Sequence, residues 1–167
     1  MFIIIIMNLI FVKNFSILNI PVKAAQSCNR ASWMCRRRYF MATKENFFRT
    51  SDGLYLYFED TGGVLRPLIL IPGFSASTKI FHRSVPVLAE HYRVITMDPR
   101  GHGRSMKVAG NNRLDRMALD IKELIDHLKL ENVILIGHSL GGSQVAHYAE
   151  KCQEYKLSGI ILADATR

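Results

Sequence analysis

The stretch Val133-Ile134-Leu135-Ile136-Gly137-His138-Ser139-Leu140-Gly141-Gly142 decides the fold class of this chain. Its first four residues are apolar and predict a buried strand, and the sequence after them favours a helix. A serine at such a strand-to-helix turn adopts a strained backbone conformation, and side chains two residues to either side would collide there. Gly137 and Gly141 therefore have a steric reason to flank Ser139, and the pattern is typical of a nucleophile elbow.

Other apolar segments alternate with helical patterns along the chain. Aliphatic runs predict buried strands at 68–71, 93–97, 133–136 and 157–163. Three- and four-residue spacing of apolar residues and helix-compatible composition predict helices at 78–92, 112–128 and 140–151. We expect Asn112 to be the N-cap of the middle helix and Pro86 to lie near a break in the first helix.

An antiparallel hairpin is predicted ahead of these elements. Two segments rich in β-forming residues between 46 and 59 surround the turn sequence Ser51-Asp52-Gly53. Strands that then alternate with helices imply a mostly parallel sheet with helices on both faces. The predicted class is therefore α/β, with an N-terminal antiparallel hairpin and a sheet that ends after about the sixth strand.

Composition indicates one domain behind a basic N-terminal segment. The chain has 167 residues, of which 49% are hydrophobic, and this is enough for one core. Residues 1–40 contain six bases and no acid, so they hold six of the eight net positive charges and leave +2 for 41–167. We expect 1–40 to be a leader or extension, disordered or targeting, and 41–167 to be a partial domain. The basic balance belongs to the leader and does not indicate nucleic-acid binding.

The N-terminal segment does not determine the cellular location of the protein. Its first twelve residues are apolar but lack a basic n-region, and Lys13 interrupts them before the roughly 20 residues of a membrane span. An arginine-rich remainder suits an organellar presequence, a secretory leader stays open, and a cytoplasmic location is favoured. Cys28, Cys35 and Cys152 match neither a disulfide framework nor a zinc site. With no metal-ligand cluster and no glycine-rich phosphate loop in the sequence, we expect no metal site and no cofactor.

Three motifs follow one another in a characteristic order. Ile71-Pro72-Gly73-Phe74 ends an apolar strand, Asp98-Pro99-Arg100-Gly101-His102-Gly103-Arg104-Ser105 follows the next strand, and the turn at Ser139 comes last. Together they resemble the α/β-hydrolase fold superfamily over about residues 46–167. The resemblance is nearest to its esterase, lactonase and cofactor-free haloperoxidase branches.

This resemblance implies a catalytic role for the elbow. It implies that Ser139 attacks a carbonyl carbon and forms an acyl-enzyme. The backbone N–H groups of Phe74 and Leu140 would form the oxyanion hole. The expected substrate is a small ester, lactone or related acyl compound, and the expected activity is that of a serine hydrolase.

The catalytic triad is incomplete in this sequence. In the superfamily the order is serine, acid, histidine, and Asp164 after the last strand is a candidate acid. The only histidine after Ser139 is His147, which one helix places about 12 Å away, too far to be the base. We expect His138 to be a packing or loop-contact residue and His102 to be a turn or site-wall residue. The triad base is therefore expected to be missing from this chain.

Several further expectations concern loops and edges. Asp98 is expected to anchor its turn through local hydrogen bonds. Arg100 and Arg104 are expected to be solvated loop charges, with contact to an anionic substrate as the alternative. The last strand, 157–163, is expected to be an apolar sheet edge without a neighbour.

Two alternatives to a serine hydrolase stay open. The first is a non-catalytic truncated form, or a pseudo-hydrolase that binds a ligand or partner, which the missing base favours. The second is an unrelated α/β domain whose serine motif is accidental, which the ordered motifs disfavour.

Overall fold

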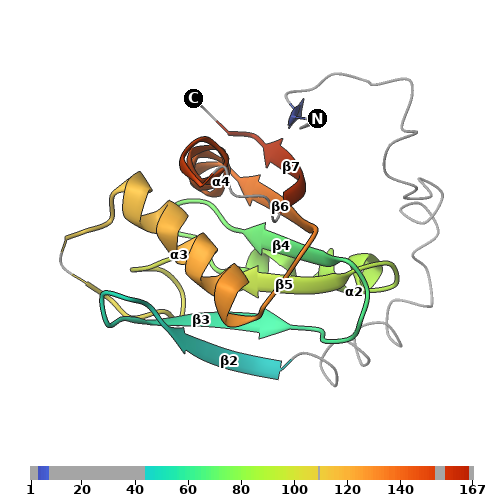
Figure 1. Cartoon of the computed structure of the whole chain (residues 1–167), viewed down its shortest axis with the longest axis horizontal. Helices are drawn as coiled ribbons and strands as arrows, with labels where there is room; N and C mark the ends of the chain where they lie inside the picture. The colour runs from blue at the N-terminus through green and yellow to red at the C-terminus, as the bar shows by residue number, and fades with distance from the viewer. Residues whose placement is uncertain (1–3, 8–43, 109, 153–156, 166–167) are drawn as a thin grey trace.

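The computed structural model describes residues 4–7, 44–108, 110–152 and 157–165 (Figure 1). The leader expected at 1–40, with Cys28 and Cys35, lies outside these residues except for 4–7. The boundary expected at residue 41 is likewise outside them and stays a prediction.

Seven strands form one sheet within the described part of the chain, in the order β1-β7-β6-β4-β5-β3-β2. The strands are β1 (Ile4–Met7), β2 (Lys44–Arg49), β3 (Tyr55–Asp60), β4 (Pro67–Ile71), β5 (Arg93–Met97), β6 (Val133–His138) and β7 (Leu157–Ala163). In this spatial order, the neighbouring pairs β1–β7, β7–β6, β6–β4 and β4–β5 are parallel. Strand β3 pairs antiparallel with both β5 and β2. The predicted α/β class, with a mostly parallel sheet and an N-terminal hairpin, is confirmed.

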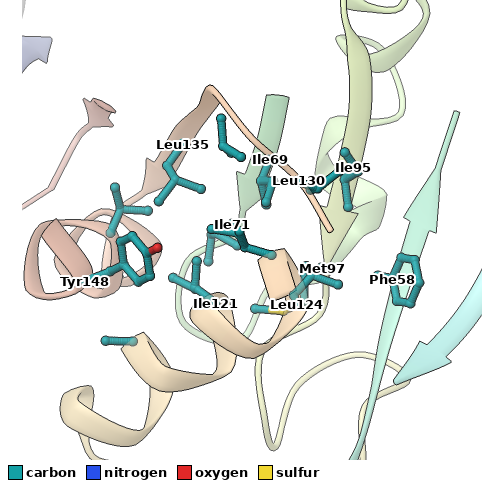
Figure 2. Packing of buried hydrophobic residues seen from close by; sticks show 14 of the residues in the cluster. Phe58, Ile69, Ile71, Ile95, Met97, Ile121, Leu124, Leu130, Leu135 and Tyr148 are labelled. Carbon is teal, nitrogen blue, oxygen red and sulfur yellow. The ribbon is translucent and has the colours of Figure 1, made fainter. Parts of the chain in front are cut away.

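Helices cover both faces of the sheet. The helical elements are η2 (Thr78–Phe81), a short 3-10 helix, α2 (Val85–Leu88), α3 (Leu114–His127) and α4 (Leu140–Lys151). One face packs against α3 and α4, and Figure 2 shows Ile121 and Leu124 of α3 beside Ile71 of β4. The other face packs Leu68 and Val94 against Val85 of α2. Each fully buried side chain of this kind contributes about 1.5–3 kcal/mol to stability.

One predicted helix boundary is wrong, and one predicted break is confirmed. Helix α3 begins at Leu114 with Arg113 as its N-cap, so Asn112 does not cap it. The break expected near Pro86 is confirmed, because η2 ends at Phe81 and α2 begins at Val85, with Pro86 in its first turn. A proline is accepted there because the first N–H groups of a helix have no intrahelical acceptor. None of the helices in the described residues is long and apolar enough to cross a bilayer.

The last strand is not an unpaired edge, which corrects the expectation from the sequence. Strand β1 lies parallel to β7, with Ile4 opposite Ile160 and Met7 opposite Ala163 (Figure 1). The segment that fills this position comes from the expected leader, at the far end of the sequence. Sequence periodicity gives no sign of a pairing over such a separation.

The connections of the parallel sheet change direction between β4 and β6. Strands β4 and β6 are parallel neighbours, so their carboxyl ends lie at the same edge of the sheet. The chain leaves β4 toward the face covered by α2 and leaves β6 toward the face covered by α4. Adjacent strands whose connections depart to opposite faces leave a crevice between their carboxyl ends, where ligands bind in open α/β sheets.

Candidate active site

Ser139 follows the carboxyl end of β6 in a strained backbone conformation. Its φ is 51° and its ψ is −121°, a combination that non-glycine residues rarely adopt and that costs about 1–3 kcal/mol. The Ser139 carbonyl accepts hydrogen bonds from the N–H groups of Gly142 at 2.8 Å and Ser143 at 3.3 Å, which begins α4. Ser139 is half-buried, so part of the residue is exposed to solvent.

The two flanking glycines have no room for a side chain. A Cβ on Gly137 would overlap the carbonyl group of Gly141, and a Cβ on Gly141 would overlap the carbonyl oxygens of Ile71 and Pro72. Backbone atoms cannot move away as the end of a flexible side chain can. The tight turn that presents Ser139 therefore requires glycine at both positions.

A third glycine, Gly73, brings the loop after β4 against the serine. A Cβ on Gly73 would lie 3.0 Å from Cβ of Ser139 and 3.2 Å from Nδ1 of His138. Sequence reasoning used this loop only for the backbone of Phe74 and missed the close contact. The available signal was the Pro72-Gly73 pair, directly after the strand that neighbours the elbow.

Two backbone N–H groups come from the segments that meet at Ser139. Leu140 is the first residue of α4, and the first N–H groups of a helix have no intrahelical acceptor. The N–H of Phe74 follows the closely packed Gly73. The ring of Phe74 is 74% exposed and contacts the ring of His102 edge to face, with 5.7 Å between centroids. The two rings thus pack together at the residue that follows Gly73.

The loop at 98–105 is fixed by buried hydrogen bonds to Asp98. The Asp98 carboxylate accepts from the N–H of Thr78 at 2.6 Å and from the N–H of Arg104 at 2.8 Å. The Ser105 hydroxyl donates to the Asp98 carbonyl at 2.6 Å. Asp98 is 1% exposed. These contacts make Asp98 the loop anchor that the sequence suggested.

Arg100 is not a solvated loop charge. Its side chain is fully buried and donates to both carboxylate oxygens of Asp120, at 2.6 and 2.7 Å. It also donates to Asp52 in the hairpin turn at 3.0 and 3.2 Å. Hydrogen bonding from Arg100 lowers the pKa of Asp52 from 3.8 to about 2. Burial lowers the pKa of Arg100, but the two carboxylates outweigh burial and raise it.

Arg104 also has protein partners. Its guanidinium carbon lies 4.3 Å from the ring centroid of Tyr57, and one nitrogen donates to the Tyr57 hydroxyl at 3.0 Å. It forms an ion pair with Glu45 of β2 at 2.7 Å. The alternative that these loop arginines receive an anionic substrate is therefore not supported by their contacts.

Three histidines near the elbow differ in their surroundings. Nδ1 of His102 lies 2.9 Å from the carbonyl oxygen of Arg100, and because a carbonyl only accepts, this nitrogen carries a proton. Nδ1 of His138 is buried and has no hydrogen-bond partner among the described residues. Nε2 of His147 lies 2.6 Å from Asp115, which joins α4 to α3, and this hydrogen bond lowers the pKa of Asp115.

Asp164 lies next to the elbow through its backbone. The carbonyl of the preceding residue, Ala163, accepts the N–H of Ser139, and the following residue, Ala165, packs against Gly142. Asp164 itself is exposed and has a φ of 51°. Its carboxylate thus belongs to the same edge of the sheet as the serine.

Two buried polar residues were missed at the sequence level. Asp120, 1% exposed, lies on the apolar stripe of α3, and Gln144, 0% exposed, lies on the buried face of α4. The signal for Asp120 was its spacing from Met117 and Leu124, which predicts an inward carboxylate that needs a cation. In the part of the chain that the structure describes, neither polar atom of the Gln144 side chain has a hydrogen-bond partner.

Comparison with known proteins agrees with this geometry. The sequence model of the alpha/beta hydrolase fold matches residues 66–166. A non-heme haloperoxidase from Rhodococcus erythropolis is 33% identical over 120 residues, which are 71% of this chain and 43% of that protein. A bifunctional esterase/perhydrolase from Acinetobacter calcoaceticus is 29% identical over 121 residues, 71% of this chain and 44% of that protein.

A solved structure shows the same likeness. The esterase from Exiguobacterium antarcticum superposes with a TM-score of 0.69 at 36% identity, covering 73% of this chain and 46% of the esterase. The chain therefore spans less than half the length of these relatives.

Proposed function

Because the chain belongs to the α/β hydrolase fold family, we propose that Ser139 is the nucleophile of a serine hydrolase. The proposed substrate is a small ester, lactone or related acyl compound. One observation carries the proposal, namely that a half-buried serine with φ of 51° lies where the Gly73 loop meets the first turn of α4. Such strain is kept where the surroundings enforce it, and it gathers at functional sites.

The chemistry follows from what surrounds the hydroxyl. Oγ of Ser139 attacks the substrate carbonyl carbon while its proton passes to a base, and the tetrahedral intermediate then expels the leaving group, which takes this proton, to give an acyl-enzyme. In the proposal, the N–H groups of Leu140 and Phe74 bind the negatively charged oxygen of the tetrahedral intermediate. Leu140 adds the positive end of the α4 dipole. Loss of one such donor typically lowers kcat by about 10²–10³-fold.

We assign no histidine of this chain to the triad base. His147 is hydrogen-bonded to Asp115 of α3, and His138 precedes the serine with its Nδ1 against Gly73. The proposal therefore takes the base from outside these 167 residues and keeps Asp164 as a candidate acid. Without its base, a triad serine retains roughly 10³–10⁴-fold catalysis over water.

The acyl acceptor in the proposed reaction is water or hydrogen peroxide. The relatives carry the names haloperoxidase and esterase/perhydrolase, and both reactions can proceed through the same acylated serine. For this chain, Phe74 and His102 would form one wall of the acyl site, because their rings are in contact beside the oxyanion segment. In this proposal, residues other than Phe74 and His102 determine whether the protein prefers esters or lactones.

A second candidate is a protein that binds an acyl ligand without turning it over. The observation that favours it is the engagement of His147 with Asp115, which leaves the serine of this chain without a histidine partner from its own helix. Ligand binding would still use the crevice between β4 and β6.

Hydrolysis of p-nitrophenyl acetate and of a small lactone tests the proposal on the intact chain. We expect slow hydrolysis that disappears in Ser139→Ala and persists in Ser143→Ala, the matched serine one turn further along α4. Hydrolysis that survives Ser139→Ala contradicts the proposal. Saturable binding of the ester with no turnover would favour the second candidate.

A further inference from the structure

Beyond its pairing with β5, strand β3 is flanked by the end of the loop at 98–105 and the residue after it. The N–H of Tyr57 donates to the Ser105 hydroxyl at 2.8 Å, and the Tyr55 carbonyl accepts the N–H of Met106 at 3.0 Å. The next donor along the strand, the N–H of Tyr55, donates to the sulfur of Met106 at 3.2 Å. A thioether sulfur therefore takes the place of a backbone carbonyl at the start of β3.

This sulfur belongs to an exposed residue. Met106 is 43% exposed, and its contact with the Tyr55 N–H lies at the surface as well. Met97 of β5 and Met117 of α3, two other methionines whose side chains the structure describes, are 0% and 3% exposed. A thioether is only a weak hydrogen-bond acceptor, so one N–H leaves its lone pairs open to reaction with an oxidant that can reach them. Of these three sulfurs, the one in Met106 is accessible.

We propose that Met106 is an oxidation site, at which hydrogen peroxide or an organic peroxy acid converts the thioether to the sulfoxide. The oxidant transfers one oxygen atom to a lone pair of the sulfur, so that its O–O bond breaks and an S–O bond forms. Methionine loses two electrons, and hydrogen peroxide is reduced to water or the peroxy acid to its carboxylic acid. This reaction needs no turnover at Ser139, so it is tested separately from the proposed function.

The fold gives the new oxygen a hydrogen-bond donor. Oxidation converts an apolar thioether into a polar group whose oxygen accepts hydrogen bonds better than sulfur does. The Tyr55 N–H, which donates to the sulfur before oxidation, lies within reach of this oxygen, because methionine has three rotatable side-chain bonds and Met106 is partly exposed. Oxidation should therefore strengthen the hydrogen bond at the start of β3 and leave the hairpin folded.

Met106 also connects this hydrogen bond to the loop beside the elbow. Its carbonyl accepts the N–H of Gly101 at 3.1 Å, and the residue after Gly101, His102, contacts the ring of Phe74. When Met106 moves so that its sulfoxide oxygen binds the Tyr55 N–H, its carbonyl moves relative to Gly101. We therefore expect oxidation to change the surroundings of Gly101 as well as those of Tyr55.

Mass spectrometry after peroxide treatment tests the site. The intact chain is exposed to hydrogen peroxide, and the rates of sulfoxide formation at Met97, Met106 and Met117 are measured in proteolytic peptides. We expect oxidation of Met106 to be at least about tenfold faster than that of the two buried methionines, because exposure controls access. In urea, where the fold is lost, the three rates should become similar.

Two results of this experiment overturn the proposal. Similar rates at the three methionines of the folded chain, or faster oxidation at a buried one, show that Met106 is not a preferred site. A rate difference that persists unchanged in urea shows that the local sequence, and not the exposed position beside β3, causes it.

Amide signals in NMR spectra test the hydrogen bond of the sulfoxide. Oxidation should shift the signals of Tyr55 and Gly101 and slow hydrogen exchange at Tyr55 several-fold. Met106→Leu is the matched control, because leucine is apolar and of similar size but has no sulfur. Peroxide should leave the Tyr55 and Gly101 signals of this variant unchanged, and its Tyr55 amide should exchange faster than that of the parent chain. Equal shifts in Met106→Leu, or Tyr55 exchange that oxidation does not slow, would contradict the proposed hydrogen bond.

Discussion

The backbone N–H of Ser139 donates a hydrogen bond of 2.9 Å to the carbonyl oxygen of Ala163. This bond continues the β6–β7 ladder to the point where the chain turns into α4. The strained φ of the serine is therefore enforced from β7 on one side and from the closely packed glycines on the other.

Gly137→Ala should strongly destabilise the protein. The new methyl group would overlap the backbone of Gly141, and overpacking of this kind costs about 1–3 kcal/mol or more. Gly159→Ala is the control, because a Cβ there meets nothing within 4 Å. Urea unfolding monitored by circular dichroism measures both changes. Equal urea midpoints for the two variants would show that the turn accommodates a methyl group at residue 137, which contradicts the close packing described above.

Gln144→Met should stabilise the protein by about 1–2 kcal/mol. Burial of a polar group without a hydrogen-bond partner is unfavourable, and methionine has a similar shape without the amide. Gln144→Glu should destabilise it increasingly as the pH rises, because the buried carboxyl must ionise. Thermal unfolding at several pH values tests the pair. A methionine variant less stable than the parent would mean that the amide has a partner in solution.

Asp120→Ala should cost about 3–5 kcal/mol, because it removes the main partner of the buried Arg100 guanidinium. The control is Lys122→Met, which breaks the more exposed pair with Asp126 and should change stability by about 0.5 kcal/mol or less. Denaturant midpoints of the two variants give the comparison. Similar losses of stability in both variants would contradict a large stabilising contribution from the buried ion pair.

Stability should fall on acidification through the Asp52 carboxyl. Its pKa is lowered from 3.8 to about 2, chiefly by hydrogen bonds from Arg100. A lowered folded-state pKa contributes stability that is complete above the unfolded-state pKa and is lost as the pH falls through the folded-state value. Asp52→Asn should therefore reduce the pH dependence of the urea midpoint between about pH 4 and about pH 2. An unchanged pH profile would contradict the ion pair.

The sheet and the elbow were predictable because they depend on local patterns. Aliphatic runs at 68–71, 93–97 and 133–136 can only be buried strands when helical patterns alternate with them. The glycines at 137 and 141 follow from sterics within one turn. The order of the three motifs then gave the family without any knowledge of side-chain contacts.

What could not be predicted depends on contacts distant in sequence. Arg100 is an ordinary loop residue until the fold brings Asp52 and Asp120 to it. The pairing of Ile4–Met7 with β7 joins segments more than 150 residues apart, and no periodicity encodes such a partner.

Covalent labelling of the serine tests the central claim most directly. The intact chain is treated with a fluorophosphonate in the presence of increasing imidazole, which supplies the missing base from solution, and the labelled peptide is identified by mass spectrometry. The account predicts modification of Ser139, faster with more imidazole, absent from Ser139→Ala and retained in Ser143→Ala. Modification spread over other residues, or a yield that Ser139→Ala leaves unchanged, would contradict a nucleophilic role for this serine.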